Sequence, residues 1–405
     1  IVYQNLYFPL ADLALRDYAA LSVMAVLFGQ LPTAGKDVIA LQDEIKATMG
    51  SFGCEVSVFS ERGTVDSCRP YFAVTASFLE EKSGAAERLI AEILTETRFC
   101  QAEKIFEILC QCQNSFEQAV IMNGNSYAMR RVASHYTAEG ALSEQLGGYS
   151  CLNWVKEMVG AYQKRSKELI AFYQNQQKQI FTSAGLTVSV TGNLTEDGPA
   201  ALIALLPQGG DREELLVRSV FYHEPEAGVN DEKEEKIPIP ADISYAVLGS
   251  NHYRYNIPRS GKLRVLSKIM SLEYLWNEVR VKGGAYGTGF SINDRGDCLF
   301  YSYRDPDAER SLTSYQKAAD FLEEFCREQG SLDGYVIATI SDMDSVLRAR
   351  DKGDIEDVRY FRGVTYEERC RERQEILKIQ KEDLLTMKEL LEQIAEDHRI
   401  CIVGK

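Results

Sequence analysis

Two side chains that could bind a peptide or stabilise a negative charge flank a glycine turn in NEVRVKGGAYGTGF, residues 277–290. Arg280 precedes Gly283 and Gly284, and Tyr286 follows them. A guanidinium supplies a rigid fork of donors and a phenol supplies one hydroxyl, so the pair could bind a peptide carbonyl or a developing oxyanion. A purely structural alternative remains open, in which a helix ends at the glycines with a cation in its last turn and an ordinary strand aromatic follows.

A helix and a strand are expected to position this pair. Apolar residues at helical spacing in residues 262–276 predict a helix that the glycines end. Gly287 and Gly289 remove side chains from the following strand, so that an extended peptide could approach its backbone. We therefore predict that Gly283, Gly284 and Gly287 take part in substrate binding.

The same helix–glycine–strand pattern occurs earlier in the chain. Residues 41–53 (LQDEIKATMGSFG) align without a gap with the segment around Arg280 (LWNEVRVKGGAYG). In this alignment Lys46 matches Arg280, and Phe52 matches Tyr286. The first copy keeps a cation and a ring but lacks the fork and the hydroxyl. A pair that is present in only one copy is what a specialised site would show.

The internal similarity extends over the whole chain. Each copy is preceded by a long helical pattern and followed by an alternating strand and a further helix, and each closes on a β-like run into glycine, at residues 186–192 and 399–404. The chain therefore reads as two α/β units, residues 1–193 and 241–405. Residues 194–240, with their charged run, are interpreted as a solvated linker.

Local patterns predict an α+β fold with two homologous units, each a largely antiparallel sheet packed with helices. The order strand, helix, hairpin, helix pair, strand supports this class. Asp305 before Pro306 predicts an N-cap, and Thr365 with Glu368 predicts a capping box.

Composition excludes several kinds of partner. A formal net charge of −15 makes nucleic acid or an anionic membrane an unsuitable partner. No apolar run reaches the ~18–20 residues that span a bilayer. The ten cysteines include no C-x-x-C pair, which favours reduced, mostly buried thiols and a cytoplasmic location. The start at Ile1 is interpreted as that of an excised fragment or a processed chain.

The histidines do not predict a metal site in this chain. None of His135, His223, His252 and His398 lies in an H-E-x-x-H or H-x-x-E-H motif. His135 and Glu139 could share a helix face, but two such groups form a hydrogen bond more often than a metal site. Neither a G-x-S-x-G motif nor a phosphate-binding glycine loop is present.

Taken together, LWNEVRVKGGAYGTGF and the following LFYSYRDPD resemble the C-terminal half of the pitrilysin/insulinase metallopeptidases, and most closely the presequence-protease (falcilysin-like) branch. Residues 125–148 fit the first unit of that half, so the resemblance covers essentially the whole chain. It implies four similar α/β domains in two bowl-like halves that enclose a chamber. This chain would supply the third and fourth domains.

The resemblance also implies roles. The family's N-terminal half carries the inverted zinc motif, whose two histidines and distal glutamate hold the metal while another glutamate activates water; this chain lacks that motif. The C-terminal half supplies an arginine and a tyrosine that reach the bound peptide, which correspond by position to Arg280 and Tyr286. The expectation is the substrate-binding half of a zinc peptidase for short unfolded peptides, inactive without its N-terminal half.

Two alternatives remain from the sequence. The chain could be a non-catalytic scaffold or partner subunit that kept the fold and lost the metal. It could also be an unrelated α/β binding protein in which the glycine turn is only a helix stop. Retention of both Arg280 and Tyr286 argues against a pure scaffold, which has no need of them.

Overall fold

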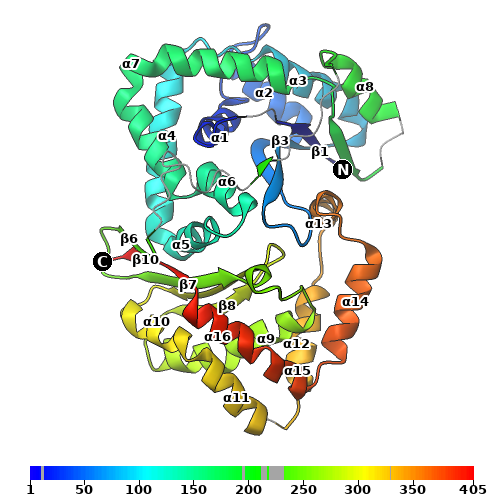
Figure 1. Ribbon diagram of the computed structural model, residues 1–405. Helices are drawn as coiled ribbons and strands as arrows, with labels where there is room; N and C mark the ends of the chain where they lie inside the picture. Colours follow the sequence, from blue (N-terminus) through cyan, green and yellow to red (C-terminus); the bar gives the residue numbers. More distant parts are fainter. Residues whose placement is uncertain (11–12, 194–196, 211–216, 219–231, 329) are drawn as a thin grey trace.

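The computed structural model describes residues 1–10, 13–193, 197–210, 217–218, 232–328 and 330–405. Helices and strands are grouped into two units, one above the other in Figure 1. The first unit contains β1 Val2–Pro9, α1 Asp17–Leu27, α2 Val38–Thr48, β2 Met49–Phe59, β3 Ser67–Phe78, η1 Glu80–Lys82, α3 Ser83–Glu96, α4 Ala102–Met122, α5 Gly124–Ala133, α6 Ala138–Gly147, α7 Tyr149–Ile180, β4 Thr187–Thr191, α8 Asp197–Leu205 and β5 Val217–Arg218.

The second unit repeats this mixture of helices and strands. It contains β6 Glu234–Pro238, β7 Tyr245–Asn251, η4 His252–Tyr255, α9 Lys262–Ile269, η5 Met270–Val281, β8 Gly287–Ile292, β9 Asp297–Tyr303, α10 Ala308–Gln316, α11 Ala318–Glu328, α12 Asp333–Met343, α13 Ala349–Phe361, α14 Tyr366–Leu377, α15 Lys381–Thr386, α16 Lys388–Glu396 and β10 Arg399–Gly404. No described helix is both long and apolar enough to cross a membrane.

The two sheets have the same strand order. The first runs β2-β3-β1-β4, with β5 pairing with β3, and the second runs β8-β9-β7-β10-β6. Every pairing is antiparallel except that of β6 with β10. Thus β1, β2, β3 and β4 correspond in order to β7, β8, β9 and β10. The predicted fold class, α+β with largely antiparallel sheets packed with helices, is confirmed.

Each unit has a hydrophobic core of its own on one face of its sheet. In the first, Phe8 and Phe72 face α1, α3 and α7; in the second, Leu248 and Phe300 face α9, η5 and α16. These residues share one face because side chains along a strand point alternately to the two faces of the sheet. Burial of many such large apolar side chains stabilises each unit independently.

The other face of each sheet is covered by a helix from the opposite unit (Figure 1). Helix α5 packs on the second sheet, where Tyr127 and Val132 join Tyr245 and Val247 in one buried cluster. Helix α13 packs on the first sheet, where Phe361 stacks on Phe59 with ring centroids 4.6 Å apart and also contacts Tyr7 and Tyr71. Each unit therefore contributes one helix that covers the sheet of the other unit.

Hydrogen bonds fix α13 on the first sheet. The carboxylate of Asp357 accepts from Asn5 Nδ2 at 2.8 Å, from the Tyr7 hydroxyl at 2.8 Å and from Ser189 Oγ at 2.5 Å. Asp357 is buried. A buried carboxylate is stable in such a place because each of these donors replaces a lost water.

The predicted linker, residues 194–240, requires a correction. Leu202 of helix α8 and Leu206, directly after that helix, pack into the first core, and β6 adds a strand to the second sheet. The ends of the segment therefore belong to the two units, and residues 211–216 and 219–231 lie outside the described residues. The charged run predicted a linker because β6 is an edge strand in which only Ile237 is buried, so most of its other side chains are charged, as in a solvated segment.

Two local capping predictions had different outcomes. The capping box of Thr365 and Glu368 is confirmed at the start of α14. The N-cap of α10 is Asp307, not Asp305 as predicted. Asp305 is buried instead, and accepts from Asp307 N at 2.9 Å and from Ser311 Oγ at 2.6 Å, so that it holds the preceding turn rather than the helix end.

Candidate functional site

The helix that carries Arg280 is wound more loosely than an α-helix. α9 continues without a break into η5, a π-helix, and after it Lys282 N donates to the carbonyl of Asn277, five residues back, at 3.0 Å. π-Helical turns are rare and are found frequently at functional sites. The geometry sets Arg280 in the last turn, directly before the glycine turn.

Both glycines of the turn are required by the backbone. A Cβ at Gly283 would lie 2.5 Å from the carbonyl oxygen of Val279, and Gly284 has a φ of +83°. Neither position accepts a side chain without rearrangement. Gly287 is different, because a Cβ there would make only an ordinary contact with Tyr303 at 3.5 Å. The first two glycines thus shape the turn, whereas the third leaves the strand backbone uncovered.

Arg280 and Tyr286 come together around a tryptophan. The guanidinium carbon of Arg280 lies 4.0 Å from the ring centroid of Trp276 and 5.9 Å from that of Tyr286. A guanidinium over an aromatic face is held by the ring quadrupole, and Trp is the strongest partner. Trp276 was missed by sequence reasoning, although its place four residues before Arg280 is the spacing of helical neighbours.

The polar atoms of this pair are free to bind. Tyr286 is 68 % exposed, and its ring packs edge-on against Tyr303 with centroids 5.9 Å apart. Within the described parts of the chain, neither the Tyr286 hydroxyl nor the Arg280 guanidinium has a hydrogen-bond or ion-pair partner. An exposed phenol and a half-buried guanidinium, both unpaired, therefore lie side by side.

The pair stands at the open start of an edge strand. β8 pairs only with β9 within its sheet, so its outer backbone groups face the helix. At Phe290 these groups are satisfied by the helix, since the amide donates to Ser271 Oγ at 3.0 Å and the carbonyl accepts from Ser267 Oγ at 2.5 Å. Gly289 is buried beside the ring of Tyr301, so the accessible part of the edge is limited to the half-buried Gly287 and Thr288, which follow Tyr286 directly.

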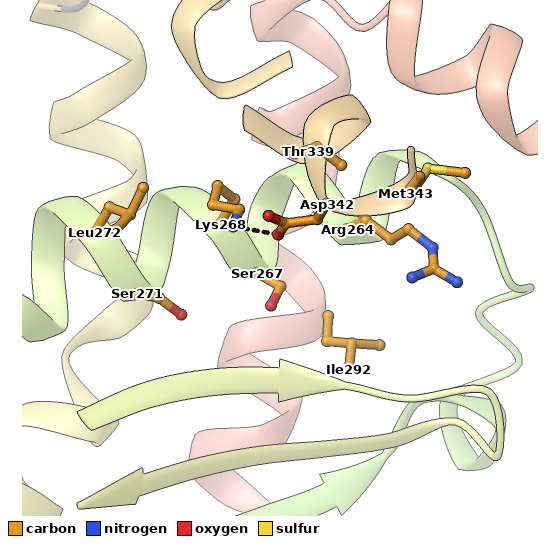
Figure 2. Close-up of a pocket in the computed structure, with 9 residues that line it drawn as sticks. All are labelled: Arg264, Ser267, Lys268, Ser271, Leu272, Ile292, Thr339, Asp342 and Met343. Atoms are coloured by element: carbon orange, nitrogen blue, oxygen red, sulfur yellow. Dashed lines mark hydrogen bonds and ion pairs between the residues drawn. The ribbon is translucent and has the colours of Figure 1, made fainter. Parts of the chain in front are cut away.

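A separate pocket of about 260 Å³ lies at the other end of the same helix (Figure 2). Ser267, Ser271 and Ile292 line it, and an ion pair of 2.5 Å between Lys268 and Asp342 crosses one wall. Neither Arg280 nor any of the predicted glycines lines this pocket. The predicted residues thus form an exposed surface site rather than part of a cavity.

The matching corner of the first unit is built differently. Lys46 also lies in the last turn of its helix, α2, and is exposed. Phe52, however, is half-buried and packs against the first core. Phe52 belongs to β2, whose pairing with β3 is irregular between Met49 and Ser51, just before Phe52. The first corner therefore presents a lysine alone, with no adjacent phenol.

The described histidines are occupied by structural contacts. Nδ1 of His252 is 2.7 Å from the carbonyl of Ile257, Nδ1 of His398 is 3.0 Å from that of Ile394, and burial lowers the pKa of both rings. Among the described residues no group of three or more His, Cys, Asp and Glu side chains could hold a metal ion, so this part of the chain does not fit zinc. His223 lies outside the described residues.

The predicted helix face shared by His135 and Glu139 is wrong. His135 lies in the turn between α5 and α6, whereas Glu139 lies in the first turn of α6. The Glu139 carboxylate accepts from Ser60 N at 2.9 Å and pairs with Arg362 at 2.5 Å. All ten cysteines are free thiols, and half of them are buried.

Comparison with known families matches the two parts of the chain to two different family models. The family model for the domain associated with subfamily C of the M16 peptidases matches residues 1–158, and the model described as "PreP C-terminal domain" matches residues 234–404. The two matches lie in the expected order along the chain and leave residues 159–233 unmatched, which include most of α7 together with β4, α8 and β5.

Curated relatives match over almost the whole chain. "Protein HypA" of Clostridium perfringens is 25% identical over 100% of this chain and 41% of its own length. A mitochondrial presequence protease of Yarrowia lipolytica is 25% identical over 87% of this chain and 35% of its own length. The chain thus spans about two fifths of the length of these relatives. Among solved structures, a "peptidase M16 inactive domain" from Pseudomonas fluorescens has the same fold, with a TM-score of 0.62 at 14% identity, covering 100% of this chain and 92% of that one.

Proposed function

Since this chain belongs to the presequence-protease branch of the pitrilysin/insulinase peptidases, as a homologue of their C-terminal portion, we propose that it is the substrate-binding half of a zinc-dependent peptidase. Its substrates are short unfolded peptides, degraded inside a chamber that this half closes with an N-terminal catalytic half. That half is part of the same polypeptide or a separate chain. A cytoplasmic location, suggested by ten unpaired thiols, belongs to the same proposal.

The observation that carries the proposal is the unpaired state of Arg280 and Tyr286. An arginine near the surface of a protein of net charge −15 has many carboxylates available, yet the half-buried Arg280 guanidinium is held by Trp276 and has no acidic partner among the described residues. A scaffold has no reason to keep two such donors together. A site that binds a carbonyl or carboxylate oxygen requires such donors.

The pair's chemistry follows from its donors. A peptide that adds to the open start of β8 would pass Tyr286, whose hydroxyl donates one hydrogen bond to a carbonyl oxygen. Arg280 can donate two parallel bonds to a neighbouring oxygen. When the carbonyl is attacked, its oxygen gains negative charge and both bonds become stronger, which lowers the barrier.

The attacking group and the metal that activates it are assigned to the N-terminal half. Zinc in a peptidase activates a water molecule and polarises the carbonyl. In this proposal the present chain contributes binding and orientation of the peptide.

Reconstitution tests the proposal. The 405-residue chain alone should release no peptide fragments and retain no stoichiometric zinc after washing with a chelator. Mixing it with the N-terminal half encoded with it should restore cleavage of an unfolded fluorogenic peptide. One tightly held zinc per chain, or cleavage without the second half, would contradict the proposal.

A further inference from the structure

A cavity of about 390 Å³ lies where the β2–β3 hairpin of the first unit meets α13 and α14 of the second. The backbone of the two units is joined there, because Arg62 N donates to the carbonyl of Arg362 at 3.0 Å. Six arginines and three acidic residues line it together with an apolar wall: Arg62, Arg259, Arg264, Arg359, Arg362, Arg369, Asp294, Asp354, Glu372, Met343, Ile355, Val358 and Val364. In a chain of net charge −15 this excess of arginine is unusual.

The carboxylates of the cavity are shared between arginines. Glu372 pairs with Arg62, with Arg259 at 2.8 Å and more distantly with Arg264 at 3.9 Å. Asp294 pairs with Arg259 and lies 3.5 Å from Arg264. The guanidiniums of Arg62, Arg259 and Arg264 thus form most of their ion pairs with only two carboxylates, and those of Arg264 are the longest.

Three guanidinium N–H groups of this cavity remain without an acceptor among the described residues. They are Nη1 of Arg62, Nε of Arg264 and Nε of Arg369, and each of these atoms is buried. Arg62 Nη1 forms an ion pair with Glu368 at 3.4 Å but no hydrogen bond. A buried donor that lacks an acceptor costs on the order of 1–3 kcal/mol, so a side-chain shift that brought one of these groups onto an oxyanion in the cavity would remove a penalty as well as gain a charge-assisted bond.

The lining of the cavity carries more cationic than anionic side chains. Burial and the neighbouring guanidiniums of Arg264 and Arg62 lower the pKa of Arg259. Although burial acts in the opposite direction, four surrounding arginines hold the pKa of the Asp294 carboxyl below its ordinary value. A protein that gathers mutually repelling cations in a half-closed site gains from an added anion.

We propose that this cavity binds a phosphate group carried by a small organic molecule, with the guanidiniums of Arg62, Arg264 and Arg369 as donors. The planar fork of arginine matches a phosphate bidentately, and the volume is that of a small-ligand site. Met343, Ile355, Val358 and Val364 supply a wall for the apolar body of the ligand. Because the donors come from both units, the ligand ties the β2–β3 hairpin to α14. This site is independent of the Arg280–Tyr286 surface.

Calorimetric titration of the 405-residue chain with phenyl phosphate and with inorganic phosphate, at one ionic strength balanced with sodium chloride, tests the proposal. Saturable binding of phenyl phosphate and an increase in Tm are expected. Tighter binding of phenyl phosphate than of inorganic phosphate would show that the apolar wall contacts the organic part of a phosphomonoester. Equal affinity for both ligands would keep the phosphate site and assign free phosphate as its ligand.

Arg264→Gln is the first variant, because Arg264 contributes only the long ion pairs to the fold. It should weaken phosphate binding at least ~10-fold, as the loss of one charge-assisted bond implies. Arg369→Gln, which removes a donor on α14, should do the same if the first variant unfolds. Arg165→Gln is the matched control, since Arg165 forms similar ion pairs of 3.2–3.3 Å on α7, and it should bind as the parent does. Absence of saturable binding in the parent, or parental affinity in both cavity variants, would show that the arginines form only a structural ion-pair network.

Discussion

The α2–β2 corner of the first unit and the η5–β8 corner of the second are reached by the same topology, yet they present different groups. In the first, Phe52 is turned onto the core and Lys46 stands alone; in the second, Tyr286 is exposed beside Arg280. The fold of the first unit shows that neither an exposed phenol nor a guanidinium is needed to build the corner. The second pair is therefore not needed to build the corner, which supports its proposed role in substrate binding.

The two sheets also differ in what covers their second face. α5 covers the second sheet through close backbone packing, with Gly124 against the ring of Tyr245. α13 covers the first sheet through buried polar contacts, in which Asp357 is the common acceptor. Two different kinds of contact thus hold the units together, and each can be broken separately.

The largest change in stability is expected from Asp357→Ala. It leaves Asn5, Tyr7 and Ser189 without their shared acceptor inside a buried contact, and should lower the free energy of unfolding by about 3 kcal/mol. Urea titration followed by circular dichroism measures it. Lys352→Ala, an exposed change on the same helix, is the control and should shift stability by less than about 0.5 kcal/mol. Equal stability of the two variants would mean that α13 is not anchored by Asp357.

A smaller loss, about 2 kcal/mol, is expected from Gly124→Ala. The added Cβ would lie 2.2 Å from a ring carbon of Tyr245, so α5 must move away from the sheet. Gly160→Ala in the exposed part of α7 meets nothing within 4 Å and should instead stabilise by about 0.5–1 kcal/mol, as alanine does in a helix. The same urea titration compares both, and the same sign for the two variants would argue against the close packing of α5.

The smallest effect on stability is a pH dependence confined to the second unit. Burial lowers the pKa of His252, which also faces Arg259 and Asp297, and that of His398. The unfolded chain takes up protons near pH 6.5, whereas these folded rings do so only at lower pH. The stability they contribute is therefore complete above about pH 6.5 and is lost as the pH falls towards their folded pKa values. Unfolding of parent and His398→Gln between about pH 7.5 and 5.5 measures this, and the variant should show the shallower decline; a parent whose stability rises on acidification would contradict it.

Local sequence signals predicted what depends on neighbours in the chain. The capping box of Thr365 and Glu368 and the strand that includes Phe72 need only nearby residues. The α+β class and the duplication followed from such segments. The prediction of Asp305 as an N-cap was wrong because its carboxylate accepts a hydrogen bond from Ser311 instead. A carboxylate just before a helix can either cap the helix or hold the preceding turn, and the local sequence does not distinguish the two.

Non-local packing could not be read in the same way. Nothing in the residues around Asp357 indicates that three side chains from the first sheet will meet it, the nearest of them 168 positions away. The candidate pair, Arg280 and Tyr286, was found because the duplication exposed a difference between two copies. The same comparison did not point to Trp276, which packs on the guanidinium, because its match in the first copy is Gln42, a residue of a different type.

The central claim is that the second corner acts on substrate and the first does not. The turnover of an unfolded peptide by the reconstituted two-half enzyme carrying Tyr286→Phe tests it most directly, with Tyr366→Phe as control because Tyr366 is also 68 % exposed. The account predicts that kcat falls ~10²-fold, equivalent to about 2.7 kcal/mol, with unchanged Tm, because only the donated hydrogen bond is removed. Arg280→Lys should also lower kcat, since a point charge does not replace the fork. Turnover by Tyr286→Phe at the parental and control rate would contradict the account and reduce Tyr286 to an exposed strand aromatic.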